Sequence, residues 1–289
     1  MTALEYSQEP LHGGALALAE FFGLVTPQDF AEFGRIHPKP ILVQQREENW
    51  VHKPILEGDI NVPVVLEVLH MLRERRAENC KQLDGKETDL LLRLWQSLVP
   101  EESADSISAP EADGERRITP SSSWKSLGFQ GIDPATDFRS MGGLALRMLV
   151  YFAEERTESA RTALEMSHRQ PAWYPFATAG INIAAFVLHL AQTRALDPLL
   201  HAALAVHSAT VCFGLGVTEP KSERTEDAEI GMEAIYDLFS DCFEDWAATW
   251  AASESTSPMD FPSVFQDFRK RWENRYPQPE TREPASGWS

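Results

Sequence analysis

The sequence predicts an all-α protein, and three features of the chain support this fold class. Apolar residues recur at helical spacing in several separate stretches, such as the run that contains Leu90, Leu94 and Leu98. No run alternates between apolar and polar residues with the period of two typical of half-buried strands. No period of about 20 to 50 residues recurs, so nothing indicates a solenoid. Because 43% of the 289 residues are hydrophobic, we expect a single globular helical domain with helical N- and C-terminal additions.

Helical patterns account for most of the chain on both sides of its middle. Before residue 100 we expect helices over 15–24, from Thr26 onward, over 64–80 and over 90–98, with an irregular segment over 38–54. Later in the chain we expect helices over 144–152, 157–167, 173–192, 198–213, 230–246 and 261–272. The stretches 173–192 and 198–213 are apolar nearly all round, which is typical of buried central helices. The tail from Tyr276 onward is rich in Pro and Glu, and we expect it to fray.

The segment 101–123 has a different composition from its surroundings. It is rich in Ser, Pro, Ala and acidic residues and has almost no core-forming residues. Such segments cannot bury enough apolar surface to offset the entropy of ordering. We therefore expect a disordered loop that is dispensable for folding.

The charge balance is strongly acidic. The chain has 44 Asp and Glu residues against 26 Lys and Arg residues, for a formal net charge of −18. Nucleic acids and anionic membranes require a basic footprint, so we expect neither to be the main partner. Arg73, Arg75 and Arg76 form one local basic cluster against this background.

The cysteines and the first residues favour a cytoplasmic protein. Cys80, Cys212 and Cys242 are widely spaced and odd in number, so they indicate neither a disulfide framework nor a metal site. The chain begins without the basic and apolar runs of a secretion signal, and polar residues interrupt every long apolar stretch, so we expect no transmembrane segment. His201 and His207 are six residues apart and do not share a helical face. The sequence therefore predicts no metal site and no cofactor.

The stretch 124–152 combines a shaped loop with a helix. Its first part is dense in glycine, which permits positive φ and close backbone approach. Pro134 suits the first position of a helix, and Asp133 before it is a natural cap. Arg139 lies at the junction between the loop and the following helix.

This loop closely resembles the signature of the ELMO domain of engulfment-and-cell-motility proteins and the smaller ELMO-domain-containing proteins. The residues that match the family pattern in register are Trp124, Gly128, Phe129, Gln130, Pro134, Thr136, Asp137, Phe138, Arg139 and Gly142. One departure is Ser140, which stands where the family usually has glycine and matters if that position requires positive φ or tight packing. The resemblance implies an N-terminal helical extension over 1–84, an ELMO-like domain over 85–255, and a C-terminal helix and tail over 256–289.

The resemblance also implies a function in which the chain has no chemistry of its own. Small ELMO-domain proteins act as GTPase-activating proteins for Arf-family and Arf-like small GTPases, and the arginine at the position of Arg139 is implicated in that activity. The partner GTPase carries GTP and Mg²⁺, and the protein is expected in the cytoplasm, peripheral on organelle membranes through partners. A second hypothesis is a non-catalytic interaction module that binds a small GTPase or an exchange factor, as in the large engulfment complexes.

Each group of motif residues has two open interpretations. The aromatic residues Trp124, Phe129 and Phe138 either anchor the loop on the helices or contact a partner. The polar residues Gln130, Thr136 and Asp137 either touch the partner's nucleotide or switch loop, or hold the loop and cap the helix. Arg139 either pairs with Asp133, Asp137 or loop carbonyls, or reaches phosphoryl oxygens as an arginine finger.

Overall fold

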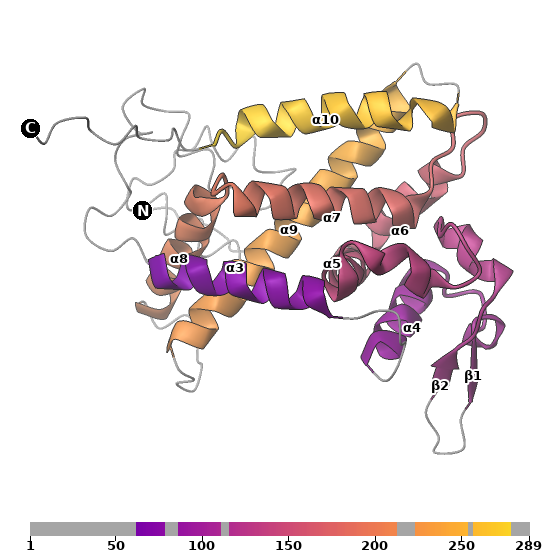
Figure 1. Ribbon diagram of the computed structural model, residues 1–289, viewed down its shortest axis with the longest axis horizontal. Helices are drawn as coiled ribbons and strands as arrows, with labels where there is room; N and C mark the ends of the chain where they lie inside the picture. Colours follow the sequence, from indigo (N-terminus) through magenta and orange to yellow (C-terminus); the bar gives the residue numbers. More distant parts are fainter. Residues whose placement is uncertain (1–61, 79–85, 111–115, 213–222, 254–256, 279–289) are drawn as a thin grey trace, which may run out of the picture. The chain divides into compact units, whose positions relative to one another are not determined.

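The expectation of an all-α protein is confirmed by a computed structural model (Figure 1). The structure describes residues 62–78, 86–110, 116–212, 223–253 and 257–278. The helices and the irregular segment expected before residue 61 lie outside these residues. The α-helices are α3 (Val62–Ala77), α4 (Lys86–Leu98), α5 (Gly142–Glu155), α6 (Thr157–Ser167), α7 (Phe176–Gln192), α8 (Asp197–Cys212), α9 (Glu223–Ala252) and α10 (Phe261–Arg275).

The packing of the chain divides it into two compact units. One comprises Leu69–Ala195 with Ile235–Ser289, and the other comprises Met1–Val68 with Leu196–Ala234, so α3 and α9 contribute residues to both. In the second unit, Gly231 of α9 lies so close to Val68 that a Cβ at the glycine would be 2.6 Å from Val68 Cγ2. The missing side chain therefore allows the close approach of α9 to α3 within that unit.

The core of the unit that contains the glycine-rich loop is built from α4, α5, α6 and α7. Helix α5 packs against each of the other three. Gly180 of α7 permits close approach to α5, because a Cβ there would lie 2.4 Å from Leu149 Cδ2. Among the described residues no single helix is long and apolar enough to cross a membrane. Helices α7 and α8 reach the necessary length and apolar composition only when they are taken together, and the chain bends by 85° at the break between them.

Aromatic side chains join α10 to the rest of this unit. The Trp246 ring of α9 lies 4.8 Å from that of Phe261 and 5.4 Å from that of Phe265, measured between ring centroids. Phe186 of α7 meets Phe268 in an edge-to-face contact, and Figure 1 shows α10 alongside α7. The expectation that the tail frays from Tyr276 is wrong at that residue, because its ring is 5% exposed and stacks on Trp272.

A buried ion-pair network fastens the α5–α6 junction to α9. Arg156, whose side chain is 8% exposed, lies 2.8 Å from Asp241, 3.3 Å from Asp237 and 3.5 Å from Glu244, measured from guanidinium nitrogen to carboxylate oxygen. Burial opposes the charge of the guanidinium, but the three carboxylates outweigh burial and raise the pKa of Arg156. Removing the arginine would leave the carboxylate of Asp241, whose side chain is 9% exposed, without this countercharge, so this network stabilises the position of α9 at the α5–α6 junction.

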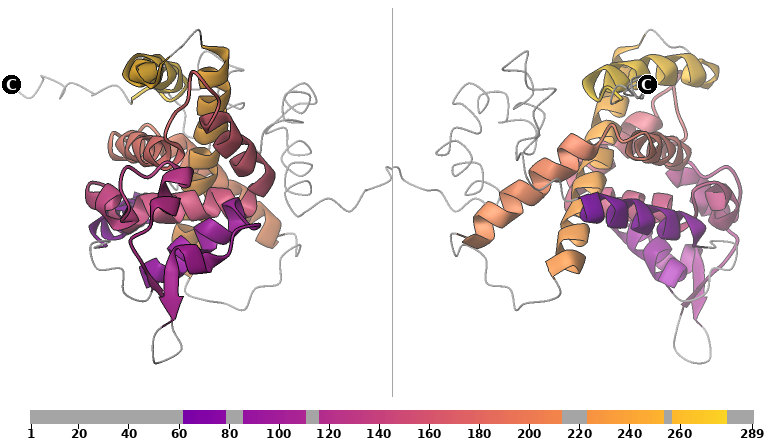
Figure 2. Two further views of the ribbon diagram at one scale, coloured as in Figure 1. Left: turned by 90° about the vertical axis from the view of Figure 1, so that its right-hand side faces the viewer. Right: turned by 60° about the vertical axis from the view of Figure 1, so that its left-hand side comes forward.

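The expectation of a disordered loop over 101–123 is wrong for the residues that the structure describes. Strand β1 (Ser108–Pro110) pairs with β2 (Arg116–Ile118) in an antiparallel hairpin beside α4, after a 3-10 turn, η3 (Ala104–Ser106) (Figure 2). Ile107 and Ile118 are buried, and Arg116 pairs with Asp105 at 2.5 Å. Each strand is only three residues long, too short to produce a visible alternation in the sequence.

Candidate functional site

The glycine-rich loop begins with a 3-10 helix, η4 (Ser122–Leu127), that ends on a left-handed glycine. Gly128 has φ of +80°, and a Cβ there would lie 2.2 Å from the backbone nitrogen of Phe176. The Thr178 hydroxyl of α7 donates a 3.1 Å hydrogen bond to the Gly128 carbonyl. Glycine is therefore required at this turn, and the turn rests directly on the start of α7.

The aromatic residues of the motif form a buried row beneath the loop. Trp124 contacts Trp95 of α4 edge to face with ring centroids 5.5 Å apart. The row continues from Trp124 to Phe129 and from Phe129 to Phe138, with 5.7 Å between centroids at each step. All four side chains are buried. Their contacts are therefore made inside the protein, where they support the loop.

The polar residues of the loop are hydrogen-bonded to its own backbone. The Gln130 N–H donates to Asp137 Oδ2 at 2.7 Å, and the Ala135 N–H donates to Asp133 Oδ1 at 3.0 Å. The Thr136 hydroxyl donates to the Asp133 carbonyl at 2.8 Å. These bonds shape a second 3-10 helix, η5 (Pro134–Arg139), with Asp133 as its cap.

Arg139 is exposed at the end of η5. Within the part of the chain that the structure describes, its guanidinium forms no hydrogen bond and no ion pair. The expected alternative of pairing with Asp133 or Asp137 is not observed, and each of these carboxylates instead accepts a hydrogen bond from a backbone N–H group. Ile132, which the sequence analysis did not single out, is 51% exposed on the same loop. Arg139 and Ile132 are thus both exposed to solvent, on a loop whose backbone is held by the hydrogen bonds described above.

Ser140 does not need to be glycine. Its φ is −92°, in the region that any residue adopts, and its carbonyl accepts a 3.1 Å hydrogen bond from Nε of Arg76 in α3. The glycine that the backbone does require is Gly142, with φ of +51°, where a Cβ would lie 2.2 Å from the Arg76 carbonyl oxygen. The departure from the family pattern at Ser140 therefore leaves the loop geometry intact.

The C-terminal end of α3 supports the loop, and sequence reasoning missed this role. Besides the bond from Arg76, Glu78 accepts hydrogen bonds of 3.1 and 3.3 Å from Arg147 of α5. The basic cluster was visible in the sequence, but its place beside Ser140 depends on a contact that spans 64 residues. The residue in the sequence that signals this contact is Gly142, because the absence of a side chain there makes room for the α3 backbone.

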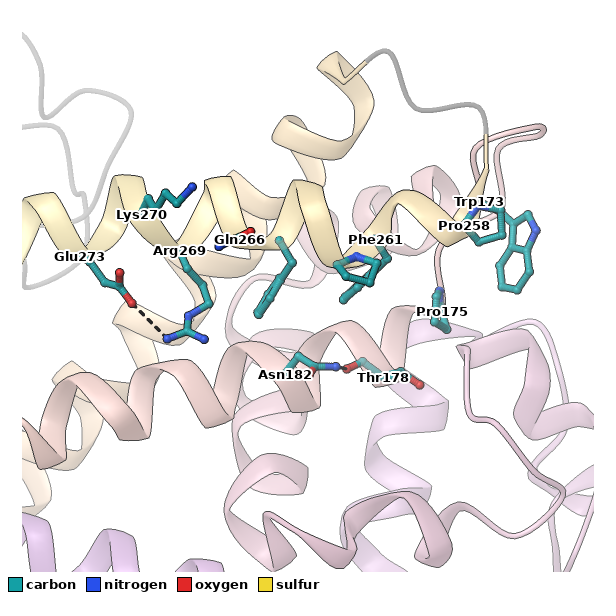
Figure 3. Close-up of a pocket in the computed structure, with 12 residues that line it drawn as sticks. Trp173, Pro175, Thr178, Asn182, Pro258, Phe261, Gln266, Arg269, Lys270 and Glu273 are labelled. Carbon is teal, nitrogen blue, oxygen red and sulfur yellow. Dashed lines mark hydrogen bonds and ion pairs between the residues drawn. The ribbon is translucent and has the colours of Figure 1, made fainter.

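A groove of about 670 Å³ lies between α7 and α10 (Figure 3). Its walls include Trp173, Pro175 and Phe261, with the Arg269–Glu273 ion pair at one end. Thr178 lines the groove and also bonds to Gly128, so the groove adjoins the back of the loop. None of the motif side chains from Trp124 to Gly142 lines it.

The helical core, the buried aromatic row and the loop that displays an arginine define an ELMO-type domain. The model of the ELMO/CED-12 family matches residues 70–265, and the chain belongs to this family. The match begins before and ends after the range 85–255 expected from the motif. No solved structure gives a significant match.

Several curated proteins resemble parts of the chain. ELMO domain-containing protein B of Dictyostelium discoideum is 46% identical over 100 residues, which cover 35% of this chain and 31% of that protein. Human ELMO domain-containing protein 2 is 38% identical over 108 residues, which cover 37% of this chain and 33% of that protein. The matched region thus spans about a third of the length of these two relatives.

Proposed function

We propose that this protein is a GTPase-activating protein for an Arf-family or Arf-like small GTPase, with Arg139 supplied in trans. The observation that carries the proposal is the exposed Arg139 guanidinium, which has no hydrogen-bond or ion-pair partner among the described residues. The partner would provide GTP, Mg²⁺ and the attacking water. Arg139 would stabilise the charge that develops on the transferring phosphoryl group.

An exposed arginine without an intramolecular partner suits this task. No ion pair has to be broken before the guanidinium meets phosphoryl oxygens, and its planar fork can contact two of them at once. An arginine finger supplied in trans accelerates hydrolysis by roughly 10³ to 10⁵, equivalent to about 4 to 7 kcal/mol of barrier. An effect of this size requires that the arginine be held in position, since small misplacements lose much of the gain.

The loop supports that requirement. Gly128 is held on α7 by Thr178, Gln130 is held by Asp137, and the Ser140 carbonyl is held by Arg76. These contacts come from three different parts of the unit and leave the Arg139 side chain unconstrained. The backbone on both sides of Arg139 is therefore held in place, while its side chain is available to take up the rotamer that a bound partner favours.

One observation supports both this function and a second candidate, a non-catalytic module that binds a GTPase or an exchange factor. Ile132 is an exposed apolar side chain on an ordered backbone, since the Ser121 N–H donates to its carbonyl at 2.8 Å. Such residues are suited to bury against a partner whether or not catalysis follows. Both candidates therefore use the same surface and differ only in the effect on hydrolysis.

The test is single-turnover GTP hydrolysis with a panel of purified Arf-family GTPases loaded with GTP and Mg²⁺. We expect acceleration of at least one GTPase, and we expect Arg139→Lys to remove most of it while the melting temperature and binding to a GTP-locked partner change little. Lysine keeps the charge but loses the planar fork.

Arg169→Lys, at an exposed arginine outside the loop, is the matched control. A stable, binding-competent Arg139→Lys protein with full activity would refute the catalytic role, and binding without acceleration by the wild type would favour the module.

A further inference from the structure

Two exposed arginines, Arg73 and Arg76, lie on α3, and one of them bonds to the loop that carries Arg139. Arg73 and Arg76 are three residues apart on a helix, so they are neighbours on its surface. Arg76 bonds to the carbonyl of Ser140, the residue that follows Arg139. All of these residues belong to one compact unit. The hydrogen bond therefore joins the basic end of α3 to the arginine loop.

No ion pair of the described residues neutralises the positive charge of these arginines. Arg73, Arg76 and Arg139 take part in no salt bridge there. Arg147 pairs with the nearby carboxylate of Glu78, whereas the exposed carboxylate of Glu74 lies 3.5 Å from His70, which carries a charge only when protonated. Three arginines without an ion pair thus lie on α3 and the adjoining loop of a chain whose formal net charge is −18.

We propose that Arg73, Arg76 and Arg139 form one basic docking surface for an acidic face of the small GTPase. The proposal rests on the proposed function for the identity of the partner. Within this surface Arg139 acts on the nucleotide, while Arg73 and Arg76 attract and orient the GTPase. Arg76 also donates a hydrogen bond from Nε to the Ser140 carbonyl, so a variant that tests its charge has to keep a donor at this position.

Charge favours an acidic protein over an anionic membrane as the occupant. Electrostatic recruitment to anionic lipids usually takes clusters of about four to eight basic residues. Here three arginines are exposed, since Arg75 is half-buried, and the net charge of −18 repels an extended anionic surface. A protein partner of limited size can meet the three arginines without approaching the acidic remainder of the chain.

The expected effect of the two α3 arginines is on association. Charges at the edge of an interface act chiefly on the rate of encounter between the two proteins. Salt weakens their effect, because the Debye length, about 10 Å at 0.1 M, shortens as the salt concentration rises. Arg139, in contrast, acts on the transition state. Mutations at α3 should therefore change the concentration needed for half-maximal activation, whereas mutations at Arg139 should change the maximal rate.

The experiment measures single-turnover hydrolysis over a range of activator concentrations, at low and at high salt, for four proteins. These are the wild type, Arg73→Glu, Arg76→Gln and the control Lys270→Glu on α10. Glutamine removes the charge of Arg76 but keeps an N–H donor for Ser140. We expect the half-saturating concentration to rise about tenfold for Arg73→Glu and several-fold for Arg76→Gln, with unchanged maximal rates and a smaller difference at high salt. Lys270→Glu should behave as the wild type.

The outcomes separate this proposal from the proposed function. Acceleration by the wild type with unchanged half-saturation in both α3 variants would overturn the docking surface and leave the function standing. If the wild type binds a GTP-locked GTPase without accelerating it, the same variants are compared by binding affinity, and equal affinities would overturn the docking surface. If the wild type neither binds nor accelerates any GTPase of the panel, both proposals fall. Cosedimentation with vesicles of phosphatidylcholine and phosphatidylserine that is lost in Arg73→Glu would assign the surface to lipid instead.

Discussion

The backbone N–H of Gln130 donates a 2.7 Å hydrogen bond to Oδ2 of Asp137, and this bond closes the loop that leads to Arg139. It connects Gln130, in the first part of the loop, to Asp137 in the middle of η5. The exposed Arg139 side chain takes no part in this bond. A carboxylate that accepts a backbone N–H makes one of the stronger local hydrogen bonds. The loop is therefore closed by its own residues, and the Arg139 side chain forms no hydrogen bond or ion pair within the described part of the chain.

We expect Asp137→Ala to loosen this closure. Loss of the acceptor should lower the free energy of unfolding by about 1 to 2 kcal/mol, because the Gln130 N–H loses its charged partner. Asp137→Asn keeps an acceptor oxygen and should recover much of that loss. Denaturant titration measures the stability, and single-turnover hydrolysis measures whether the maximal rate falls with it. Equal stability of the alanine variant and the wild type would show that the bond is not important in solution.

The glycine requirement at the start of α5 is tested by three substitutions. Gly142→Ala should destabilise the protein by about 1 to 3 kcal/mol or more, because of the positive φ and the clash with the Arg76 carbonyl. Gly131→Ala is the control, since a Cβ there would have no neighbour closer than 3.7 Å. Ser140→Gly, which restores the family residue, should not increase stability. Thermal unfolding of the three variants is the measurement, and a tolerated Gly142→Ala would contradict the assigned backbone conformation.

The buried aromatic row predicts a large cost for Trp124→Ala. Its side chain is fully buried between Trp95 and Phe129, so truncation should cost about 3 to 5 kcal/mol. Trp173→Ala provides a matched control, because that tryptophan is 41% exposed. We expect the control to lie within about 0.5 kcal/mol of the wild type by denaturant titration. The reverse order of the two variants would place Trp124 on the surface.

The hairpin makes the segment 101–123 a contributor to stability. We expect Ile107→Ala and Ile118→Ala each to cost about 2 to 4 kcal/mol, since both side chains are buried. Ala109→Ser, at an exposed position of the same hairpin, should be neutral. If calorimetry finds the same melting temperature for all three variants as for the wild type, the segment is dispensable for folding after all.

Much of the helical structure was predictable because it depends on interactions over a few residues. The helix expected over 157–167 coincides with α6, and those expected over 90–98 and 261–272 differ from α4 and α10 by a few residues at their ends. The cap at Asp133 and the proline that follows it were also predictable from the sequence, because side-chain caps act within three residues. The hairpin was not, because its three-residue strands are stabilised by burial against neighbouring helices rather than by their own pattern.

The sequence by itself determined the helical class, the place of the loop and the identity of the residues in its motif. Only the tertiary structure decided which of them are available to a partner. Trp124 is buried and Arg139 is exposed, although both belong to the same motif. Arg139 forms no ion pair among the described residues, and the nearby Asp133 and Asp137 accept backbone N–H groups instead. Ser140 is tolerated because its φ is −92°, and its carbonyl accepts a hydrogen bond from Arg76. That last contact joins residues 64 positions apart, and no local pattern specifies which distant surfaces meet when helices pack.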